Sequence, residues 1–401
     1  MDLTHLRADT PGCTHRVHLN NAGASLMPSS VLSAIKEHLD LEARVGGYEA
    51  AVEAATGIGA AYGAVADLLA TASGNVAFTE HATAAFVQAL SSVPLQKGDL
   101  VLTTRQDYVS NQIQYLSLAD RLGIQVLRAP DAPEGGVDLQ AMEELVHRRR
   151  PRIVAVTHVP TNSGLVQDVA AIGKMCRARD ILYLVDACQS VGQMPVHPEA
   201  LGCDFLSATA RKFLRGPRGA GFLWVSDRAL AAGLSPLFPD LRGADWVDGD
   251  LFQPAPDARR FETWEFAWGL ILGTGEAARY AMQVGLDEIR LRTRALAESL
   301  RERLPGIPGV RVLDRGPELC AIVTAAVQGW APVDLVSALR ERGINTSAQT
   351  RLDALLDYDA KGVDGALRIS PHYFNTDADL DVLLQALAEL QGRECGLPLP
   401  A

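Results

Sequence analysis

Short apolar runs alternate with amphipathic segments along the middle of the chain. The runs are rich in Val, Ile and Leu and show little polar alternation, which is typical of strands buried on both faces of a parallel sheet. They lie at residues 100–103, 124–128, 153–157, 181–186, 205–207 and 219–225. The segments between them, such as residues 138–149 and 168–179, are spaced like helices with one apolar face. This alternation predicts an α/β fold with a doubly wound core.

The pattern changes after about residue 270. A long helical stretch is predicted at residues 273–304, followed by strands at 319–325, 345–348 and 366–370 and by helices at 333–342 and 377–390. Thr376 is placed to cap the last helix. We therefore expect three parts: residues 1–49, which pack on the small domain or on a partner, a large α/β domain at 50–272, and a small α+β domain at 273–401.

Composition and charge narrow the class of protein. The 401 residues are 48% hydrophobic and 21% charged, as in ordinary globular proteins. The formal net charge of -11 disfavours nucleic acid and anionic membranes as partners, because like charges repel. The six Cys residues form no CxxC pair, which argues against a structural zinc site and a disulfide framework. The opening MDLTHLRADT does not resemble a signal peptide, so we expect a cytoplasmic protein.

Two charged residues follow predicted strands where an open α/β sheet binds ligands, beyond the carboxyl ends of its strands. Asp186 ends one apolar run, and by itself it is either a helix cap or a buried anion. Lys212 lies between a strand and a glycine-rich turn at residues 216–221. Taken alone, this segment also fits a basic surface turn, because three Arg residues lie close by.

Motif spacing separates the possible cofactors. The chain has no G-x-G-x-x-G after an early strand and no G-x-x-x-x-G-K-[ST], which disfavours a dehydrogenase or an NTPase. It also lacks G-x-S-x-G and H-E-x-x-H. Pyridoxal phosphate fits better, because it needs a lysine for its imine, an acid opposite the pyridine nitrogen and a phosphate cup. Lys212 and Asp186 can supply the first two, and residues 81–83 with Thr209 and Arg211 can form the cup.

Six motifs in this order resemble the class V aminotransferase superfamily of fold-type I pyridoxal-phosphate enzymes. They are HLNNAG at residues 18–23, HAT at 81–83, THVPTNSG at 157–164, VDACQ at 185–189, the stretch 207–221, and LRISPHYFNT at 367–376. The resemblance covers nearly the whole chain. It implies a mainly parallel seven-stranded sheet with helices on both faces, a smaller α+β C-terminal domain, pyridoxal 5'-phosphate as cofactor, and a homodimer with its active site at the subunit interface.

The resemblance also implies roles for individual residues. Lys212 would bind the cofactor aldehyde and shuttle protons, and Asp186 would pair with the pyridine nitrogen. The other cofactor-binding residues would be Ala82, Thr83, Thr161, Gln189, Thr209, Arg211 and, reaching across from a second subunit, Glu265. The substrate-binding residues would be Asn21, Ala22 and Arg368, of which Arg368 grips the α-carboxylate with two hydrogen bonds.

The chain departs from the cysteine desulfurases of this superfamily at a loop that carries their nucleophilic Cys, before the carboxylate-binding Arg. Residues 345–361 contain no Cys, and Cys320 and Cys395 lie off that loop. Desulfuration through a protein persulfide is therefore not favoured.

Two further departures concern the cofactor pocket. The position of the His that stacks on the ring in those enzymes looks like Val109, with Tyr108 as the nearby aromatic residue. Trp264 and Glu265 replace a Gly-Thr pair that usually binds the phosphate of the partner subunit. This combination looks more like the branch with hercynylcysteine sulfoxide lyase, isopenicillin-N-epimerase-like proteins and lincosamide-pathway enzymes that process cysteine S-conjugates.

The leading hypothesis is a C–S β-lyase that acts on an S-substituted cysteine or its sulfoxide. The second is decarboxylation coupled to oxidative deamination of the same kind of substrate, and transamination and epimerisation rank lower. A binding protein without catalysis is least favoured, because Lys212, Asp186 and Arg368 are all present.

Overall fold

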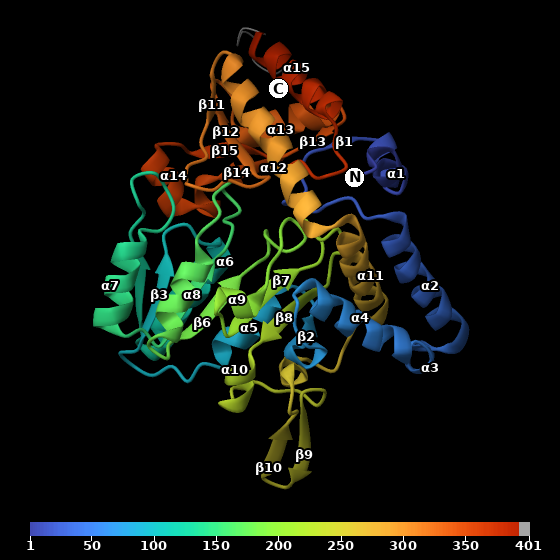
Figure 1. Cartoon of the computed structure of the whole chain (residues 1–401), viewed down its shortest axis with the longest axis vertical. Coiled ribbons are helices and arrows are strands. Elements are labelled where there is room, and N and C mark those ends of the chain that lie inside the picture. The colour runs from blue at the N-terminus through green and yellow to red at the C-terminus, as the bar shows by residue number, and fades with distance from the viewer. Residues whose placement is uncertain (393–401) are drawn as a thin grey trace, which may run out of the picture.

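A seven-stranded mixed sheet forms the centre of the molecule (Figure 1); the computed structural model describes residues 1–392. The strand order is β2-β8-β7-β6-β5-β3-β4. The strands are β2 (Val76–Thr79), β3 (Leu100–Thr104), β4 (Gln125–Ala129), β5 (Ile153–Thr157), β6 (Leu182–Asp186), β7 (Phe205–Thr209) and β8 (Gly221–Val225). β3 to β7 run parallel, whereas β8 is antiparallel to both β7 and β2. The predicted fold class is confirmed.

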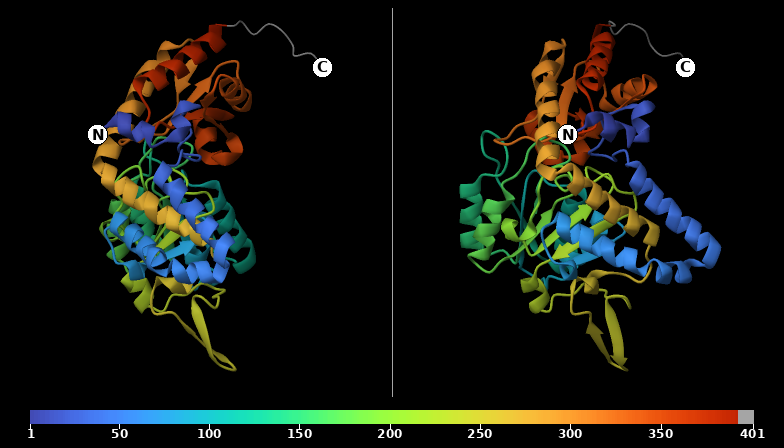
Figure 2. Two further views of the ribbon diagram at one scale, coloured as in Figure 1. Left: turned by 90° about the vertical axis from the view of Figure 1, so that its right-hand side faces the viewer. Right: turned by 45° about the vertical axis from the view of Figure 1, so that its right-hand side comes forward.

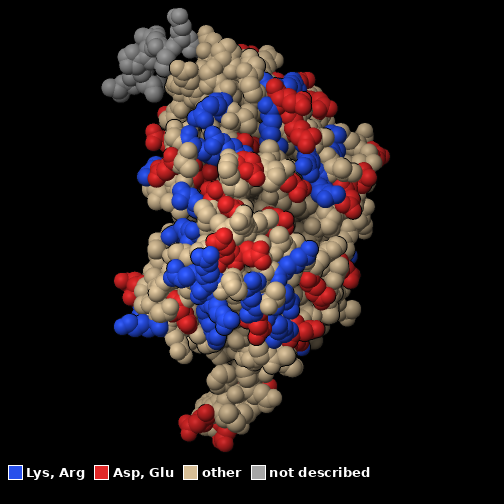
Figure 3. Space-filling model, turned by 60° about the vertical axis from the view of Figure 1, so that its left-hand side comes forward, with Lys and Arg blue, Asp and Glu red and all other residues tan. Residues whose placement is uncertain are grey.

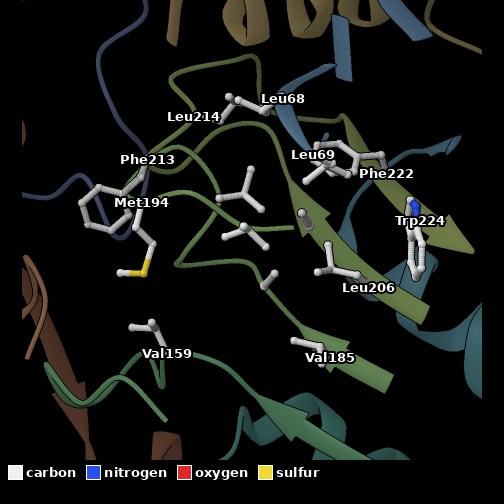
Figure 4. Close-up of a cluster of buried hydrophobic side chains, with 14 of the residues drawn as sticks. Leu68, Leu69, Val159, Val185, Met194, Leu206, Phe213, Leu214, Phe222 and Trp224 are labelled. Carbon is white, nitrogen blue, oxygen red and sulfur yellow. The ribbon is translucent and has the colours of Figure 1, made fainter. Parts of the chain in front are cut away.

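The strands are apolar throughout because both faces of the sheet are covered. Along β6, Tyr183 and Val185 join the apolar cluster on one face, and Leu184 joins the cluster on the other. Figure 4 shows part of the first cluster, where Leu206 and Trp224 lie over the sheet. Each such side chain contributes about 1.5–3 kcal/mol when it is removed from water. The apolar pattern of the strands is therefore explained by packing on two sides.

Helices precede, connect and follow these strands. The helices are α4 (Ala55–Leu68), α5 (Ala82–Ser91), α6 (Val109–Leu122), α7 (Leu139–Arg149), α8 (Val169–Arg177), α9 (Pro198–Leu201), α10 (Asp227–Ala231) and α11 (Trp268–Val284). Residues of α4, α7, α8 and α11 belong to the first cluster, and residues of α5 and α6 belong to the second. Asp138 and Asp168 cap α7 and α8 with their side chains, which explains where both helices begin.

A second, four-stranded antiparallel sheet has the order β11-β12-β15-β14. Its strands are β11 (Val310–Val312), β12 (Val323–Val327), β14 (Ser347–Thr350) and β15 (Gly365–Ile369). It packs against α12 (Leu286–Arg303), α13 (Pro332–Glu341) and α15 (Asp377–Gly392) in its own apolar cluster. α14 (Leu355–Lys361) packs against the same sheet in a separate small cluster, where Tyr358 joins Ala366 of β15. The expected α+β architecture of the C-terminal part is confirmed.

Three predicted elements of this part differ in detail. The single helix expected at 273–304 is two helices, because the chain breaks at Gly285, where φ is +92°. The strand expected at 319–325 is β12 and begins later, and the strand expected at 345–348 is divided between β13 (Ile344–Asn345) and β14. The predicted cap is present: Thr376 Oγ1 accepts a hydrogen bond from the Asp379 N–H at 3.1 Å.

The N-terminal segment runs along both parts of the molecule (Figure 2). It contains α1 (Leu3–Ala8), β1 (Val17–His18), α2 (Ser29–Val45) and α3 (Gly47–Glu53). β1 pairs in parallel with β13, and Arg7 forms an ion pair with Asp379 at 2.9 Å. α2 packs along α11. The predicted boundary between residues 272 and 273 falls inside α11, so the division into domains stays a prediction.

A hairpin of β9 (Ala244–Asp248) and β10 (Leu251–Pro254) projects from the body of the protein (Figures 1 and 2). Its side chains include an 81% exposed Trp246 and a 53% exposed Phe252. The sequence analysis did not predict this hairpin. Exposed aromatic residues that lie close together are typical of a surface that contacts another protein.

Charge is unevenly distributed over the surface. In Figure 3, Lys and Arg side chains gather over one face of the lower body, although the chain as a whole is acidic. Arg148, Arg149 and Arg177 lie in the last turns of α7 and α8, where cations interact favourably with the helix dipoles. Among residues 1–392, none of the helices has the length and apolar character needed to cross a membrane.

Candidate active site

A cavity lies where β5, β6 and β7 end. It is lined by His81, Ala82, Thr83, Tyr108, Thr157, Val159, Thr161, Asp186, Cys188, Gln189, Thr209, Arg211 and Lys212. Every predicted cofactor-binding residue except Glu265 is in this set, together with Lys212. The carboxyl ends of parallel strands, where ligands bind in open α/β sheets, therefore bring these residues together.

Asp186 is the last residue of β6 and is only 4% exposed. Its Oδ1 accepts a hydrogen bond from the Cys188 N–H at 3.0 Å, and its Oδ2 accepts one from Asn111 Nδ2 at 3.1 Å. Neither donor is charged. Asp186 is thus a buried carboxylate that the protein orients on both oxygens without a bonded cation, and it is not a helix cap.

Lys212 lies in the loop between β7 and β8 and is 8% exposed. Burial lowers the pKa of its ammonium group below the ordinary range, since desolvation penalises the charged form. The loop is held by hydrogen bonds from the N–H of Ala210 to Ala220 and from the N–H of Gly216 to Ala210. The amine is therefore presented to the cavity by a short, bonded loop.

The basic surface turn considered for this segment is not what the structure shows. Arg215 is 1% exposed, and it donates hydrogen bonds to Leu26 O, Thr10 Oγ1 and the Tyr373 hydroxyl. Its guanidinium also lies 4.6 Å from the centre of the Phe374 ring. The loop that carries Lys212 is thus anchored to the N-terminal segment and to the C-terminal part at once.

The N-terminus of α5 opens onto the cavity at Ala82 and Thr83. The first N–H groups of a helix have no acceptor within it and lie at the positive end of its dipole, so they bind anions well. Gly221 permits this arrangement, because a Cβ there would lie 2.7 Å from the His81 backbone carbon. Arg211 lines the same cavity and donates a hydrogen bond to Gly23 O.

Arg368, on β15, lies next to the cavity and is 4% exposed. It donates to Thr161 Oγ1 at 2.6 Å and to Asn20 Oδ1 at 3.3 Å, and its Nε has no partner among the described residues. Burial lowers its pKa to about 10, so the guanidinium stays charged at neutral pH. A buried cation with a free donor is suited to a carboxylate ligand.

Asn21 and Ala22 do not line the cavity. The Asn21 amide donates to Ser370 O at 2.7 Å, and the Ala22 carbonyl accepts a hydrogen bond from Gln189 Nε2 at 3.1 Å. The neighbouring Asn20 is the residue that contacts Arg368. Asn20, rather than the predicted Asn21, is therefore the Asn of this segment that lies beside Arg368.

Tyr108 lines the cavity, whereas Val109 does not. Val109 is the first residue of α6, and Tyr108 is its N-cap. The Lys212 Nζ lies 5.9 Å from the centre of the Tyr108 ring. Of these two residues, Tyr108 and not Val109 therefore faces the cavity, and the stacking role of Val109 stays an unsupported prediction.

Cysteine chemistry is restricted in this cavity. Cys188 is the cavity's one cysteine among the described residues, and burial raises the pKa of its thiol well above the ordinary range. Cys320 is buried outside the cavity, and Cys395 lies outside the described residues. A thiol held in its protonated form is a poor nucleophile.

Helix α14 forms the last seven residues of the segment 345–361, in which the resemblance to desulfurases would place a nucleophilic Cys. Lys361 Nζ and Asp357 Oδ2 form an ion pair at 2.7 Å, with side chains 4% and 5% exposed. Asn162 Nδ2 donates to the same carboxylate oxygen at 2.7 Å. The helix is therefore fastened to the residue that follows Thr161. The sequence analysis missed this ion pair, although its i,i+4 spacing was a visible signal.

Glu265 lies away from the cavity of its own chain. It lines a separate, more apolar groove with residues of α2 and α3 and with Trp264 and Phe266. Glu265 does not line the cavity that contains Lys212 of the same chain. Its predicted role in cofactor binding therefore depends on a second subunit.

Comparison with known proteins places the chain in a family. Residues 17–383 match the family described as aminotransferase class-V. The chain is 28% identical over 403 residues to a probable cysteine desulfurase of Methanothermobacter thermautotrophicus, which covers 98% of this chain and 99% of that protein. It is 30% identical over 373 residues to a probable hercynylcysteine sulfoxide lyase of Mycobacterium tuberculosis, covering 92% and 89%.

A solved structure gives the same result for the fold. The apo cysteine desulfurase of Thermococcus onnurineus superposes with a TM-score of 0.89 at 24% identity, over 97% of this chain and 98% of that one. Fold and site together define a fold-type I pyridoxal-phosphate enzyme. The chain belongs to the class V aminotransferase family, whose members act on amino acids.

The cofactor of this family is pyridoxal 5'-phosphate, and the residues present fit it. Lys212 is buried and forms no ion pair within residues 1–392, as an amine that condenses with an aldehyde requires. Asp186 is a buried acid without a bonded cation, and α5 offers an anion site on the same cavity. The Gln189 Oε1 atom is buried there without a described partner.

Proposed function

We propose that this protein is a pyridoxal-phosphate-dependent C–S β-lyase that cleaves an S-substituted cysteine or its sulfoxide. By their names, one relative reported above is a probable desulfurase of cysteine and the other a probable lyase of a cysteine derivative, hercynylcysteine sulfoxide. The observation that carries the proposal is the combination of a cavity that gathers Lys212, Asp186 and the N-terminus of α5 with a segment 345–361 that has no Cys. Such an enzyme can break a C–S bond, but its segment 345–361 offers no thiol to receive the sulfur, and burial raises the pKa of the Cys188 thiol in the cavity.

The residues divide the work of holding the cofactor. Lys212 would bind the aldehyde, and Asp186 would keep the ring nitrogen protonated. Ala82, Thr83, Thr209 and Arg211 would hold the phosphate, while Gln189 and Thr161 would face the ring hydroxyl. When bound, the cofactor supplies an electron sink for negative charge that develops at Cα of the substrate.

Arg368 would bind the substrate α-carboxylate, with Asn20 and Thr161 fixing the plane of its guanidinium. Lys212, released by the incoming amino group, would take the Cα proton; its lowered pKa favours the neutral amine that this step needs. The C–S bond then breaks, and the sulfur leaves as a thiol or a sulfenate. Addition of one water to the remaining three-carbon fragment gives pyruvate and ammonia.

The experiment is an incubation of the holoenzyme with S-alkyl-L-cysteines, their sulfoxides and free cysteine. A β-lyase yields pyruvate in a one-to-one ratio with the released thiol or sulfenate. Alanine from cysteine would instead indicate a desulfurase, and carbon dioxide with an aldehyde would indicate the oxidative decarboxylation that ranks second. The Lys212→Ala variant is the blank, and Lys174→Ala, a change on the exposed side of α8, is the matched control.

We further propose a homodimer that completes each site with Glu265 of the partner. The groove that contains Glu265 is apolar, and the nearby hairpin exposes Trp246 and Phe252. A second copy of the chain would cover these surfaces. Mixing Lys212→Ala subunits with Glu265→Ala subunits tests this directly, because a hybrid dimer would then contain one intact site. Recovery of activity above that of either variant alone supports the proposal, and no recovery contradicts it.

A further inference from the structure

A second buried carboxylate lies next to the candidate active site. Asp107, between β3 and α6, is 5% exposed. Its oxygens accept hydrogen bonds from the side chains of Thr103, Asn111, Gln112 and Thr157 and from the Tyr108 N–H. All of these donors are neutral. Asp107 is therefore well satisfied by hydrogen bonds, but its cost of burial needs an explanation beyond simple packing.

Asn111 connects this carboxylate to Asp186. Its Nδ2 lies 3.2 Å from Asp107 Oδ1 and 3.1 Å from Asp186 Oδ2, and the side chain is 2% exposed. An amide nitrogen carries two hydrogens, so one is available for each acid. The flipped amide would direct its oxygen at two carboxylates, and Asp107 therefore determines the orientation of the amide.

The two acids share one buried environment. The Tyr115 hydroxyl is buried beside them, and its pKa is raised first by burial and also by the charges of Asp107 and Asp186. Oδ1 of Asp186 already accepts a hydrogen bond from the Cys188 N–H. Because Asn111 donates to Oδ2, the carboxylate of Asp186 cannot rotate without losing a hydrogen bond at a buried site.

We propose that Asn111 is a positioning residue for Asp186, and that Asp107 holds the Asn111 amide in the orientation that donates to it. The inference rests on the proposed role of Asp186 as the partner of the pyridine nitrogen. Asn111 stabilises the ionised carboxylate and fixes its plane, and both properties strengthen its pairing with a protonated ring nitrogen. The loss of Asn111 weakens the hold on the ring rather than the hold on the phosphate.

The test measures cofactor affinity in Asn111→Ala and in Gln112→Ala. Gln112 is the matched control, because it also donates to Asp107 but does not contact Asp186. The dialysed apo-protein is titrated with pyridoxal phosphate and followed by absorbance. We expect the dissociation constant to rise roughly tenfold in Asn111→Ala, as for the loss of a hydrogen bond to a charged group, and to change less than about twofold in Gln112→Ala.

A second probe, 1-deazapyridoxal phosphate, has carbon in place of the ring nitrogen. Wild type and Asn111→Ala should bind it with equal affinity, because Asp186 then has no nitrogen to pair with. Equal losses for both cofactors would overturn the proposal and indicate a purely structural role, as would an unchanged affinity for pyridoxal phosphate. If Asn111→Ala fails to fold by circular dichroism, Asn111→Ser and Asp107→Asn are compared in its place, with the same selective loss expected.

Asp186→Asn separates this inference from the role on which it rests. If that variant binds both cofactors as wild type does, the assignment of Asp186 is wrong. If it discriminates between them and Asn111→Ala does not, only the role of Asn111 fails.

Discussion

Lys212 and Lys361 are both buried, but their surroundings differ. Lys361 is 4% exposed at its side chain and forms an ion pair with Asp357 at 2.7 Å, supported by Asn162. Lys212 is 8% exposed, and among residues 1–392 no carboxylate forms an ion pair with it. The charge of Lys361 is therefore paired with a carboxylate, whereas that of Lys212 is not paired within the described residues.

This contrast separates a buried lysine with a structural role from one that is placed for chemistry. Placing an ammonium group in a region of low dielectric is unfavourable unless a counter-charge compensates it. At Lys361 the counter-charge is Asp357, one turn earlier in α14, and Asn162 links the same carboxylate to the body of the protein. At Lys212 the unfavourable state is retained, and its consequence is a lowered pKa and an amine that is ready to react. An unpaired buried lysine is therefore the stronger indication of chemistry.

The largest expected effect follows from removing the amine of Lys212. In Lys212→Met we expect pyruvate formation from S-alkyl cysteines to fall by roughly 10⁴-fold or more, the scale on which enzymes lose a group that takes part in every chemical step. Borohydride should link the cofactor covalently to wild type and not to the variant. The same substitution at Lys361 should leave borohydride linkage intact. Covalent capture at another lysine in Lys212→Met would contradict the assignment.

The cofactor end of the cavity was predictable because local patterns determine it. Each buried strand has a continuous apolar run, and the residue at its carboxyl end is necessarily at the ligand-binding edge of a parallel sheet. Asp186 and the strand 153–157 follow directly from this rule. Lys212 and the 81–83 segment follow from their position next to such runs.

The substrate side was less predictable, because it depends on contacts between distant segments. Sequence cannot show which of two adjacent Asn residues turns toward Arg368, since Asn20 and Arg368 are brought together only by tertiary packing. The same holds for Tyr108 and Val109, where a single step at the start of a helix decides which side chain enters the cavity. The β9–β10 hairpin lies outside the apolar core, so the core pattern carried no signal for it.

A second, smaller effect is expected when the amine of Lys361 is removed. In Lys361→Met, Asp357 stays buried without its cation, so we expect the free energy of unfolding to fall by about 3–5 kcal/mol. Urea denaturation measures this change. The double variant Lys361→Met with Asp357→Leu should recover part of the stability, because it removes the unpaired charge. A single variant as stable as wild type would show that the ion pair does not contribute to stability.

A smaller effect is expected at Arg368, a buried cation that forms no ion pair within the described residues and donates a hydrogen bond to Thr161 of the cavity lining. Arg368→Lys keeps the charge but loses the planar fork, which has Thr161 and Asn20 as its present acceptors. We expect KM for the amino acid substrate to rise about tenfold to a hundredfold, the usual loss for one or two charged hydrogen bonds, with little change in kcat. Borohydride linkage at Lys212 should be unaffected. A fall in kcat at constant KM would assign Arg368 to the chemical step instead of binding.

The smallest effect is the pH dependence of stability in the apo-protein, and it tests the unpaired state of Lys212 itself. Burial lowers the pKa of Lys212 in the folded chain, whereas the unfolded chain keeps an ordinary value of about 10.4. Between these two values the unfolded state binds more protons, so the contribution of Lys212 to stability rises with pH. Near pH 7 the buried ammonium group destabilises the folded state. Lys212→Met lacks this group and should therefore be more stable than the wild-type apo-protein at that pH. The gap should close as the pH approaches about 10, by about 1.4 kcal/mol for each unit by which the pKa is lowered. Urea denaturation of the two apo-proteins across this pH range measures the difference, because the titration of all other groups is common to both. A difference in the free energy of unfolding that stays constant with pH would contradict a lowered pKa of Lys212.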